Sequence, residues 1–548
     1  MLISKHFKFY STSYLQFTKC FSYSTCQLNS KYFITTPIFY VNAAPHLGHL
    51  HSLVLADALH STHRLLGIQN TIFSTGTDEH GLKVEQSAML HKQDVHHYCD
   101  KISEKYREVC KSLSLSNTHF IRTTENRHKE TVIHFWNELA KRDHIYEGYY
   151  KGWYCTAEEA FLPSSQVIEI NEKGVIKKVS SETRQPVEWM KERNYMFTLS
   201  KFKDELLYWL KGDVIHPKIF ADKCKTWILE GLNDLSISRE KSRCNWGIPV
   251  PNDNSQIIYV WLDALVNYLT AGGYPKANFT WPVDCHIIGK DILRFHGIYW
   301  PAFLIAAGLE PPRSILCHSH WLVNDEKMSK SKGNVVDAQE IISKYKGDSL
   351  RYFLLREATL PSDANYNEVK LQRTLNSELA NTLGNLLSRC TAPAINKKQI
   401  FPQFHQEKCS EMGNDLIKSV LSMPNVVKEE FLKGSFYIGI NKIMDCLHKT
   451  NAFVEHQKPW ELAKSEEKCY ELDTVLHIAL ETLRISGILL QPVIPNISNI
   501  LLTKLGVSIK NRMWTHLECF PHINNNLHNL SGKNLGNEKV ILFNKIKI

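Results

Sequence analysis

Residues 31–49 read KYFITTPIFYVNAAPHLGH, and they predict a buried strand that turns directly into a helix. β-Branched and aromatic residues dominate 31–40, which is typical of a strand. Apolar residues over 47–66 recur at the spacing of an amphipathic helix. A second strand is expected over 71–74, and it leads into the turn TGTDEHG at 75–81. Strand, helix and strand in this order predict an α/β fold on a doubly wound parallel sheet.

The composition is that of a globular chain with several structural units. The chain has 548 residues, which at roughly 100–200 residues per domain predicts three or four units. Hydrophobic residues make up 43% and charged residues 22%, so there is enough apolar surface to exclude disorder of the whole chain. The net charge of +9 is compatible with a polyanionic partner but is not specific for one.

The cysteine and hydropathy patterns argue against further classes of protein. The 14 cysteines include no C-x-x-C pair, which disfavours a disulfide scaffold and a paired-cysteine zinc site, and favours free thiols in a reducing compartment. No run of 18 consecutive apolar residues occurs. We therefore expect no transmembrane helix and no membrane partner.

The N-terminal segment resembles a targeting sequence. No acidic residue precedes Asp57, while Lys5, Lys8 and Lys19 stand among many serines and aromatic residues. A basic, Ser-rich and acid-free start is typical of a mitochondrial transit peptide, which we predict over residues 1–29. The segment has no arginine, which argues against targeting. A disordered extension or the first strand of a domain are the alternatives.

The remaining chain divides into regions of different pattern. Aromatic and charged residues mix over about 145–230, where NEKGVIKKVS at 171–180 predicts an exposed hairpin or loop. Strand signals return at 256–260 and 285–288, and amphipathic stretches from about 371 to 505 predict a helical bundle. The predicted boundaries are 30–145 for the first half of the α/β unit, 146–230 for an insert, 231–345 for the second half, 346–370 for a linker, 371–520 for the helical bundle and 521–548 for a tail.

The motif His46-Leu47-Gly48-His49 stands where the first strand turns into the helix. A helix N-terminus offers unpaired N–H groups and a positive dipole end, which suit a phosphate. Gly48 allows a ring or a phosphate to approach the backbone closely. Two histidines three residues apart lie near one face, where they can donate hydrogen bonds to phosphate oxygens in a transition state. Capping of the helix by both histidines is the purely structural alternative.

A second motif, KMSKSKG at 327–333, combines three lysines with two serines and a glycine. Lysine is a point charge on a flexible stem, so this composition suits a mobile clamp on a leaving pyrophosphate. A solvated basic loop is the alternative for such a heptapeptide on its own.

Together, the two motifs resemble the HIGH and KMSKS signatures of the class I aminoacyl-tRNA synthetases. The first reads HLGH here, a conservative departure, and the second matches in full. The resemblance implies a Rossmann-like catalytic domain that is split by a connective insert, a stem-contact linker at 346–370 and an α-helical anticodon-binding bundle. It also implies that His46, His49, Lys327 and Lys330 are catalytic, and that ATP is bound by His46, Gly48, His49, Lys327, Met328, Ser329, Lys330 and Ser331.

Other nucleotide-binding classes lack support. No G-x-x-x-x-G-K-[ST] run is present, which disfavours a P-loop NTPase. No G-x-G-x-x-G follows the first strand, which disfavours a dinucleotide oxidoreductase.

Three segments resemble the methionine branch of the family, namely PIFYVN at 37–42, VWLDALVNY at 260–268 and IGKDILRFHGIYWPA at 288–302. Aromatic rings suit the polarizable thioether of methionine, and an aspartate suits its ammonium group. Core packing would also explain each aromatic residue alone. The residues implied to bind methionine are Ile38, Tyr40, Asp78, Trp261, Ala264, Leu265, Tyr268, His296 and Trp300.

The expected insert also favours the methionine branch. Branched-chain relatives need a hydrolytic domain, because one methylene gives only ~1–3 kcal/mol of discrimination, and 146–230 is too short for one. YKGWYC at 150–155 resembles the start of the zinc knuckle of many relatives, but the next residues are TAEE, so Cys155 has no second ligand nearby in sequence. We therefore predict no zinc. With TTPIFY at 35–40, this resembles the bacterial-type and mitochondrial subgroup.

Two segments of the predicted bundle resemble the anticodon-binding parts of the family, NTLGNLLSR at 381–389 and QKPWELAK at 457–464. The resemblance implies that Asn385, Arg389 and Trp460 contact the anticodon. Asn385 and Arg389 are four residues apart and so share a helix face. Unpaired bases are read by stacking on aromatic rings and by hydrogen bonds to their edges. A buried core tryptophan is the alternative for Trp460.

The resemblance implies activation of L-methionine with ATP, bound as its Mg²⁺ complex, and transfer of methionine to the 3′ end of tRNA(Met). The implied partners are tRNA(Met), L-methionine and ATP, and we expect a monomer in the mitochondrial matrix. Three alternatives remain: a class I synthetase for cysteine or leucine, a small nucleotidylyltransferase, and an inactive RNA-binding descendant. They are disfavoured by the missing thiolate-binding zinc ligands, by the KMSKS motif and helical region, and by the intact HLGH, KMSKS and Asp78, respectively.

Overall fold

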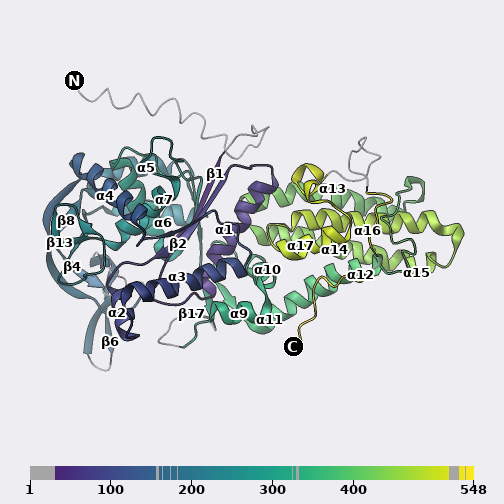
Figure 1. Ribbon diagram of the computed structural model, residues 1–548, viewed down its shortest axis with the longest axis horizontal. Coiled ribbons are helices and arrows are strands. Elements are labelled where there is room, and N and C mark those ends of the chain that lie inside the picture. Colours follow the sequence, from purple (N-terminus) through teal and green to yellow (C-terminus); the bar gives the residue numbers. More distant parts are fainter. Residues whose placement is uncertain are drawn as a thin grey trace, which may run out of the picture.

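The structure has a sheet part (residues 31–345) and a helical part (347–517), which lie one beside the other along the long axis (Figure 1). It is a computed structural model, and it describes residues 31–155, 160–162, 164–172, 175–181, 183–323, 325–328, 333–517, 530–536 and 538–547.

Six parallel strands form the central sheet, in the order β3-β2-β1-β14-β15-β9. Their bounds are β1 Tyr32–Tyr40, β2 Thr71–Asp78, β3 His119–Arg122, β9 Ile215–His216, β14 Cys285–Gly289 and β15 Ile315–His318. β1 lies between β2, its successor in the chain, and β14, which comes much later. The strand order therefore reverses at β1, and parallel sheets of this kind bind ligands beyond the carboxyl ends of their strands at such a point.

Helices cover both faces of the sheet, because successive side chains of a strand point to opposite faces. Ile34 belongs to the hydrophobic cluster of α1 and α3, whereas Phe33 belongs to the cluster of α4, α7 and α8. The doubly wound parallel sheet predicted from the sequence is therefore confirmed. The bounds of these helices are α1 Leu47–Leu65, α3 Val95–Ser112, α4 Asn126–Lys141, α7 Val260–Gly272 and α8 Trp300–Ala306.

The expected strands at 71–74 and 256–260 differ in detail from the structure. β2 continues to Asp78, so three residues of the predicted turn, Gly76, Thr77 and Asp78, pair with β1. The later signal corresponds to β13 (Asp253–Ile258), which pairs with β11 (Ser238–Glu240) and β12 (Pro249–Val250) outside the central sheet. Val260 was predicted to end this strand, and that is wrong, since Val260 begins α7. Short apolar runs do not distinguish a strand from a buried helix by periodicity alone.

The chain between α4 and β11 builds a second, antiparallel sheet of order β10-β8-β4-β5. For 171–180, where a hairpin or loop was predicted, the structure shows a hairpin that starts earlier, because β6 pairs with β7 in antiparallel fashion from Val167 to Ser180. β9 also comes from this stretch, but it pairs with β15 of the central sheet. The bounds are β4 Ile145–Cys155, β5 Ala160–Leu162, β6 Val167–Glu172, β7 Val175–Ser180, β8 Glu188–Phe197, α5 Lys203–Leu210, α6 Lys218–Glu230 and β10 Leu235–Ser236.

Smaller elements surround the edge of the central sheet that lies at the carboxyl ends of its strands. The hairpin of β16 and β17 pairs with β18 in a three-stranded sheet that follows β15 in the chain. The bounds of the remaining elements here are α2 Leu82–Leu90, β16 Trp321–Val323, β17 Glu326–Lys327, α9 Ala338–Tyr345 and β18 Ala364–Tyr366.

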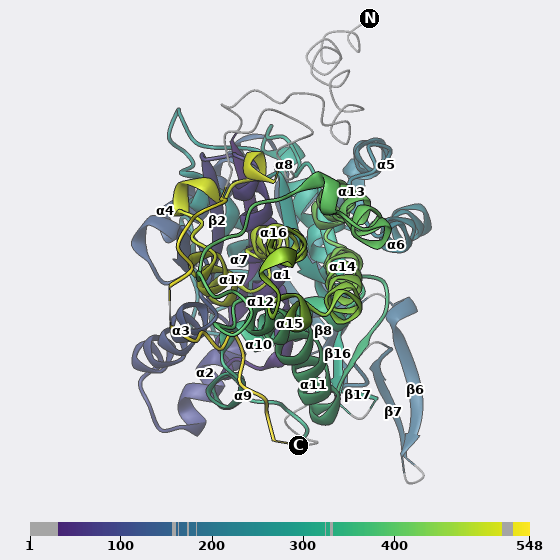
Figure 2. The same cartoon turned by 90° about the vertical axis from the view of Figure 1, so that its right-hand side faces the viewer.

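The helical part begins at α10, earlier than the amphipathic pattern predicted, and it ends at α17, close to the predicted end. α13, α14 and α16 pack against one another, and Figure 2 shows them viewed nearly along their axes. The bounds are α10 Gly347–Glu357, α11 Glu368–Thr374, a π-helical stretch Leu375–Gly384, α12 Asn385–Cys390, α13 Glu411–Leu432, α14 Phe436–Gln457, α15 Pro459–Leu462, α16 Cys469–Leu489 and α17 Pro495–Lys504.

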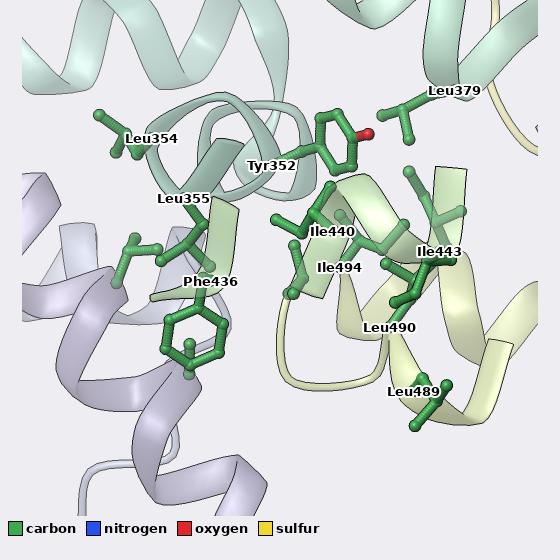
Figure 3. Packing of buried hydrophobic residues seen from close by; sticks show 14 of the residues in the cluster. Tyr352, Leu354, Leu355, Leu379, Phe436, Ile440, Ile443, Leu489, Leu490 and Ile494 are labelled. Carbon is green, nitrogen blue, oxygen red and sulfur yellow. The ribbon is translucent and has the colours of Figure 1, made fainter. Parts of the chain in front are cut away.

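One apolar core crosses the boundary between the two parts. The cluster that holds α1 also contains buried side chains of α10, α14 and α16. Figure 3 shows Tyr352 and Leu355 of α10 close to Ile440 and Phe436 of α14. Burial of apolar area contributes roughly 25 cal/mol per Å², so a shared core opposes independent movement of the two parts.

Arg351 of α10 adds a polar connection inside this core. Its guanidinium is fully buried and lies 2.7 Å from the carboxylate of Asp57 on α1. It also donates hydrogen bonds to the carbonyl oxygens of Leu113 (3.2 Å), Pro492 (2.6 Å) and Val493 (3.0 Å). One side chain therefore connects the end of α3 and the middle of α1 with the turn between α16 and α17.

We expect Arg351→Met to destabilise the protein by about 3–5 kcal/mol, because it leaves the buried charge of Asp57 without its cation. Urea unfolding followed by circular dichroism measures the change. Lys418→Met is the control, since the pair of Lys418 with Asp415 lies on the surface and its loss should leave the midpoint unchanged. Equal midpoints for Arg351→Met and the unmodified chain would contradict this role.

Candidate active site

The HLGH motif opens α1 at the carboxyl end of β1. His46 is the N-cap residue, and its Nδ1 accepts a hydrogen bond from the backbone N–H of Gly48 (3.1 Å). The Nδ1 of His49 accepts from the backbone N–H of His46 (3.1 Å), and the two rings stack with centroids 3.8 Å apart. Both histidines therefore cap the helix, as the structural alternative predicted, and capping presents them side by side at the helix N-terminus.

Capping also decides the protonation of His49. Burial, together with the nearby His46, lowers its pKa well below the ordinary value, so the ring is neutral. Because Nδ1 accepts from the backbone of His46, the single ring proton resides on Nε2. The helix N-terminus thus carries a neutral hydrogen-bond donor at the positive end of the helix dipole, an arrangement suited to an anion.

The structure brings Met328 of the second motif, and the chain just after this motif, against the first motif. The backbone N–H of Leu47 donates to the carbonyl of Val336 (3.1 Å), and that of Ala338 donates to the carbonyl of Pro45 (3.2 Å). A β-carbon added to Gly48 would lie 3.0 Å from Cε1 of His46 and 3.6 Å from the terminal methyl of Met328. Of the predicted ATP-binding residues here, Lys327 ends β17 and Met328 packs against the core. Ser329, Lys330 and Ser331 lie outside the described residues.

The residues predicted to bind methionine come from three places around the same sheet edge. Ile38 and Tyr40 lie among the last three residues of β1. Asp78 is the last residue of β2 and the register partner of Tyr40. Trp261, Ala264, Leu265 and Tyr268 belong to α7, while His296 and Trp300 lie in the π-helical stretch Phe295–Tyr299 and at the start of α8.

Direct contacts join the two helical groups. The hydroxyl of Tyr268 lies 2.7 Å from Nε2 of His296, and the rings of Tyr268 and Trp300 are 5.9 Å apart. Trp261 stacks on Phe295 at 3.6 Å, a partner that the sequence reasoning missed. Ala264, Leu265, Tyr268, His296 and Trp300 are buried, whereas Ile38, Tyr40 and Trp261 are partly exposed. The set therefore combines a buried, mainly aromatic group with three partly exposed side chains.

A buried carboxylate under the TGTDEHG segment was also missed. Asp263 of α7 lies 2.6 Å from Nδ1 of His80 and 2.7 Å from Nε2 of His128. Burial raises the pKa of Asp263, but the two histidines outweigh this effect and hold the pKa at about 2. Asp263 therefore fixes the chain just after Asp78 onto α7. The segment VWLDALVNY contains Asp263, so the sequence offered a signal for this residue. Nothing in the sequence indicated that His80 and His128 would be its partners.

Comparison with known proteins decides the family. A family profile described as tRNA synthetases class I (M) matches residues 32–391. The mitochondrial methionine--tRNA ligase of Takifugu rubripes is 47% identical over 532 residues, which cover 95% of this chain and 90% of that protein. The human mitochondrial enzyme is 45% identical, with 94% and 90% covered. The chain belongs to the methionine--tRNA ligase family.

A solved structure of the same family agrees with the fold. Mycobacterium tuberculosis methionyl-tRNA synthetase, in complex with methionyl-adenylate, superimposes with a TM-score of 0.87 at 33% identity. The match covers 94% of this chain and 99% of that one. The Rossmann-like catalytic sheet and the helical region that follows it are thus shared with a methionine--tRNA ligase of known structure.

In the described residues, no group of three or more His, Cys, Asp or Glu side chains is arranged to hold a metal ion. Thr156, Ala157, Glu158 and Glu159, which bear on the zinc prediction, lie outside them. Across the same ranges, none of the helices has the length and apolar character needed to cross a membrane.

The predicted anticodon-binding residues belong to α12 and α15, which lie in the half of the helical part that is remote from the sheet (Figure 1). Asn385 is the exposed first residue of α12, and Arg389 of the same helix forms an ion pair with Glu455 of α14 (3.1 Å). Trp460 belongs to α15, directly after α14, and is partly exposed. The ion pair therefore places Arg389 beside the C-terminal end of α14, and Trp460 follows this end in the chain.

We expect Gly48→Ala to lower the rate of methionine-dependent ATP–pyrophosphate exchange by roughly 10–100-fold, because displacement of about 1 Å at a reacting centre has an effect of this size. Stability should not fall, since alanine is the better helix former by about 1 kcal/mol. Ser61→Ala, near the other end of α1, is the control and should leave the exchange unchanged. Normal exchange by Gly48→Ala would show that close approach to this backbone is not needed.

Proposed function

We propose that this chain is the methionine--tRNA ligase of mitochondrial translation, acting in the matrix. It activates L-methionine with ATP to methionyl-adenylate and pyrophosphate, and it then transfers methionine to the 3′ end of tRNA(Met). The single observation that carries this proposal is the contact of the chain at Val336–Ala338 with the HLGH turn, which supports a site shared by both signature motifs at the N-terminus of α1.

In the first step, the methionine carboxylate attacks the α-phosphate of ATP, and pyrophosphate leaves. The ammonium group would pair with Asp78, and the thioether would lie among the aromatic side chains of α7 and the Phe295–Trp300 segment. Binding both substrates in one site removes much of the entropic barrier. The methionine-binding set is Ile38, Tyr40, Asp78, Trp261, Ala264, Leu265, Tyr268, His296 and Trp300.

Charge that spreads over the phosphates would be stabilised by hydrogen bonds from the helix N-terminus and by the lysines of the second motif. His49 suits this role, because its ring proton resides on Nε2. ATP would enter as its Mg²⁺ complex, with the cation supplied by the substrate. The proposed catalytic residues are His46, His49, Lys327 and Lys330, and Gly48, Met328, Ser329 and Ser331 complete the ATP site.

In the second step, a ribose hydroxyl at the 3′ end of the tRNA attacks the adenylate, and AMP leaves. We assign anticodon contacts to Asn385, Arg389 and Trp460, which lie on neighbouring helices remote from the sheet. The ion pair between Arg389 and Glu455 is exposed, so the arginine can exchange its partner for an RNA base at little cost.

The proposal includes the domain limits and the assembly state. Residues 1–29 act as a transit peptide, 30–145 and 231–345 form the catalytic domain, and 146–230 form a zinc-free connective insert. Residues 346–370 contact the tRNA stem, 371–520 bind the anticodon, and 521–548 form a tail. The enzyme works as a monomer.

Amino-acid-dependent ATP–pyrophosphate exchange on the purified chain tests this proposal directly. Exchange is expected with methionine and with none of the other nineteen amino acids, because the pocket is apolar and aromatic. Exchange with another amino acid would overturn the substrate assignment while leaving the class intact. A folded chain without exchange, with and without tRNA, would point to the inactive RNA-binding alternative.

We expect Trp460→Ala to weaken aminoacylation by roughly 10–100-fold in kcat/KM for tRNA, since stacking of one base contributes about 1–3 kcal/mol. Methionine-dependent exchange should stay unchanged, because activation occurs at the sheet. Tyr208→Ala is the matched control: Tyr208 is an exposed aromatic residue on α5, in the sheet part. Equal losses in exchange and aminoacylation would argue for a core role of Trp460 instead.

A further inference from the structure

His286 lies fully buried beneath the proposed methionine pocket. It sits on β14, where it is the register partner of Thr35 on β1. Its ring is 4.3 Å from the ring of Tyr268 and 6.1 Å from that of His296. The indole N–H of Trp300 donates to Nε2 of His286 (3.3 Å). One imidazole without solvent exposure thus supports three proposed pocket residues from below.

The partners of His286 decide which nitrogen carries its proton. An indole nitrogen only donates, so Nε2 must accept from Trp300 and be unprotonated. Burial, with a smaller effect of His296, lowers the pKa of His286 well below its ordinary value, so the ring is neutral. Its proton therefore resides on Nδ1, which lies 2.7 Å from the hydroxyl oxygen of Thr35. The hydroxyl oxygen of Thr35 accepts a hydrogen bond from this N–H, so both ring nitrogens are satisfied in the tautomer that holds Trp300.

We propose that His286 is a positioning residue for methionine selection, whose Nδ1–H is satisfied by Thr35 and whose Nε2 lone pair holds the indole of Trp300. It has no exposed surface and acts only through the residues above it. The inference rests on the proposed function, and it adds a layer of side chains to the pocket that the sequence resemblance did not assign.

A second set of hydrogen bonds fixes the tautomer of His296 and orients the hydroxyl of Tyr268. His296 lies with Nδ1 3.0 Å from the carbonyl oxygen of Ile292, so this nitrogen carries the proton and donates it. Burial lowers the pKa of His296 to about 4, which keeps it neutral. Its Nε2 then accepts from the hydroxyl of Tyr268. The N–H groups of Trp300 and His296 and the O–H of Tyr268 are all used within the protein.

This use of donors has a consequence for specificity. A substrate side chain that needs a hydrogen-bond donor, such as the amide oxygen of glutamine, finds none among Tyr268, His296 and Trp300. An unpaired buried polar group costs roughly 1–3 kcal/mol, whereas the thioether of methionine needs no donor. The Thr35–His286 pair therefore contributes to the rejection of polar side chains of similar length by keeping the indole N–H occupied.

The test compares Thr35→Val, which removes the hydroxyl and keeps the shape, with Thr35→Ser, which keeps the hydroxyl. In ATP–pyrophosphate exchange by the full chain, Thr35→Val should raise the KM for methionine about tenfold, as expected for one lost buried hydrogen bond. Its kcat and its KM for ATP should stay within about twofold. Thr35→Ser should match the unmodified chain, and discrimination against glutamine should fall only in Thr35→Val.

His60→Gln is the matched control for loss of a buried histidine. His60 of α1 also bonds two hydroxyls, those of Ser116 and Thr71, each at 2.8 Å, but it contacts none of the proposed pocket residues. We expect this variant to melt at a lower temperature with an unchanged KM for methionine. Equal KM values for Thr35→Val and Thr35→Ser, in an unmodified chain that exchanges with methionine, would overturn the inference without touching the proposed function.

A measurement on the unmodified chain covers the case in which Thr35→Val does not fold. Nitrogen-15 spectra of the histidine rings, with the His286 signals assigned by their loss in His286→Gln, report the tautomer directly. A proton on Nδ1 is expected at neutral pH. A proton on Nε2 of His286, or a doubly protonated ring, would overturn the inference.

Discussion

The parallel pairing of β1 with β14 is the constraint on which the rest of the structure depends. It joins Ile34 and Thr35 to Cys285 and His286 across the whole length of the insert. Because parallel strands end at the same edge, this pairing collects the HLGH turn after β1, Asp78 at the end of β2 and the Phe295–Trp300 segment after β14. Without it, the candidate site would be divided between two halves of the chain.

Two further connections complete that edge. The backbone bonds between Pro45–Leu47 and Val336–Ala338 bring the chain just after the second signature motif to the helix N-terminus. Arg351 then ties the middle of α1 to the turn between α16 and α17 through one buried guanidinium. α1 therefore begins at the candidate ATP site, and its middle is bound to α10 of the helical part through Asp57 and Arg351. This buried ion pair, together with the shared apolar core, holds the sheet part and the helical part against each other.

Neutral, buried histidines give the site its hydrogen-bond directions. Burial lowers the pKa of His49, His286 and His296, so each ring has one donor and one acceptor nitrogen. At the helix N-terminus, His49 keeps its donor nitrogen on the side away from the cap. Under the proposed methionine pocket, by contrast, His286 and His296 accept hydrogen bonds from Trp300 and Tyr268. Histidine thus donates a hydrogen bond near the proposed phosphate site and accepts hydrogen bonds near the proposed thioether site.

The sequence by itself determined the class of sheet, the family and the two signature motifs, because strand and helix periods and short contiguous motifs are local properties of the chain. It also indicated most of the proposed pocket, through contiguous segments such as VWLDALVNY. Only the tertiary structure decided that Val260 starts a helix, that Asp263 joins His80 to His128, and that His286 supports Trp300. These features rest on single residues brought together across long stretches of chain, and such contacts leave no period or spacing in the sequence.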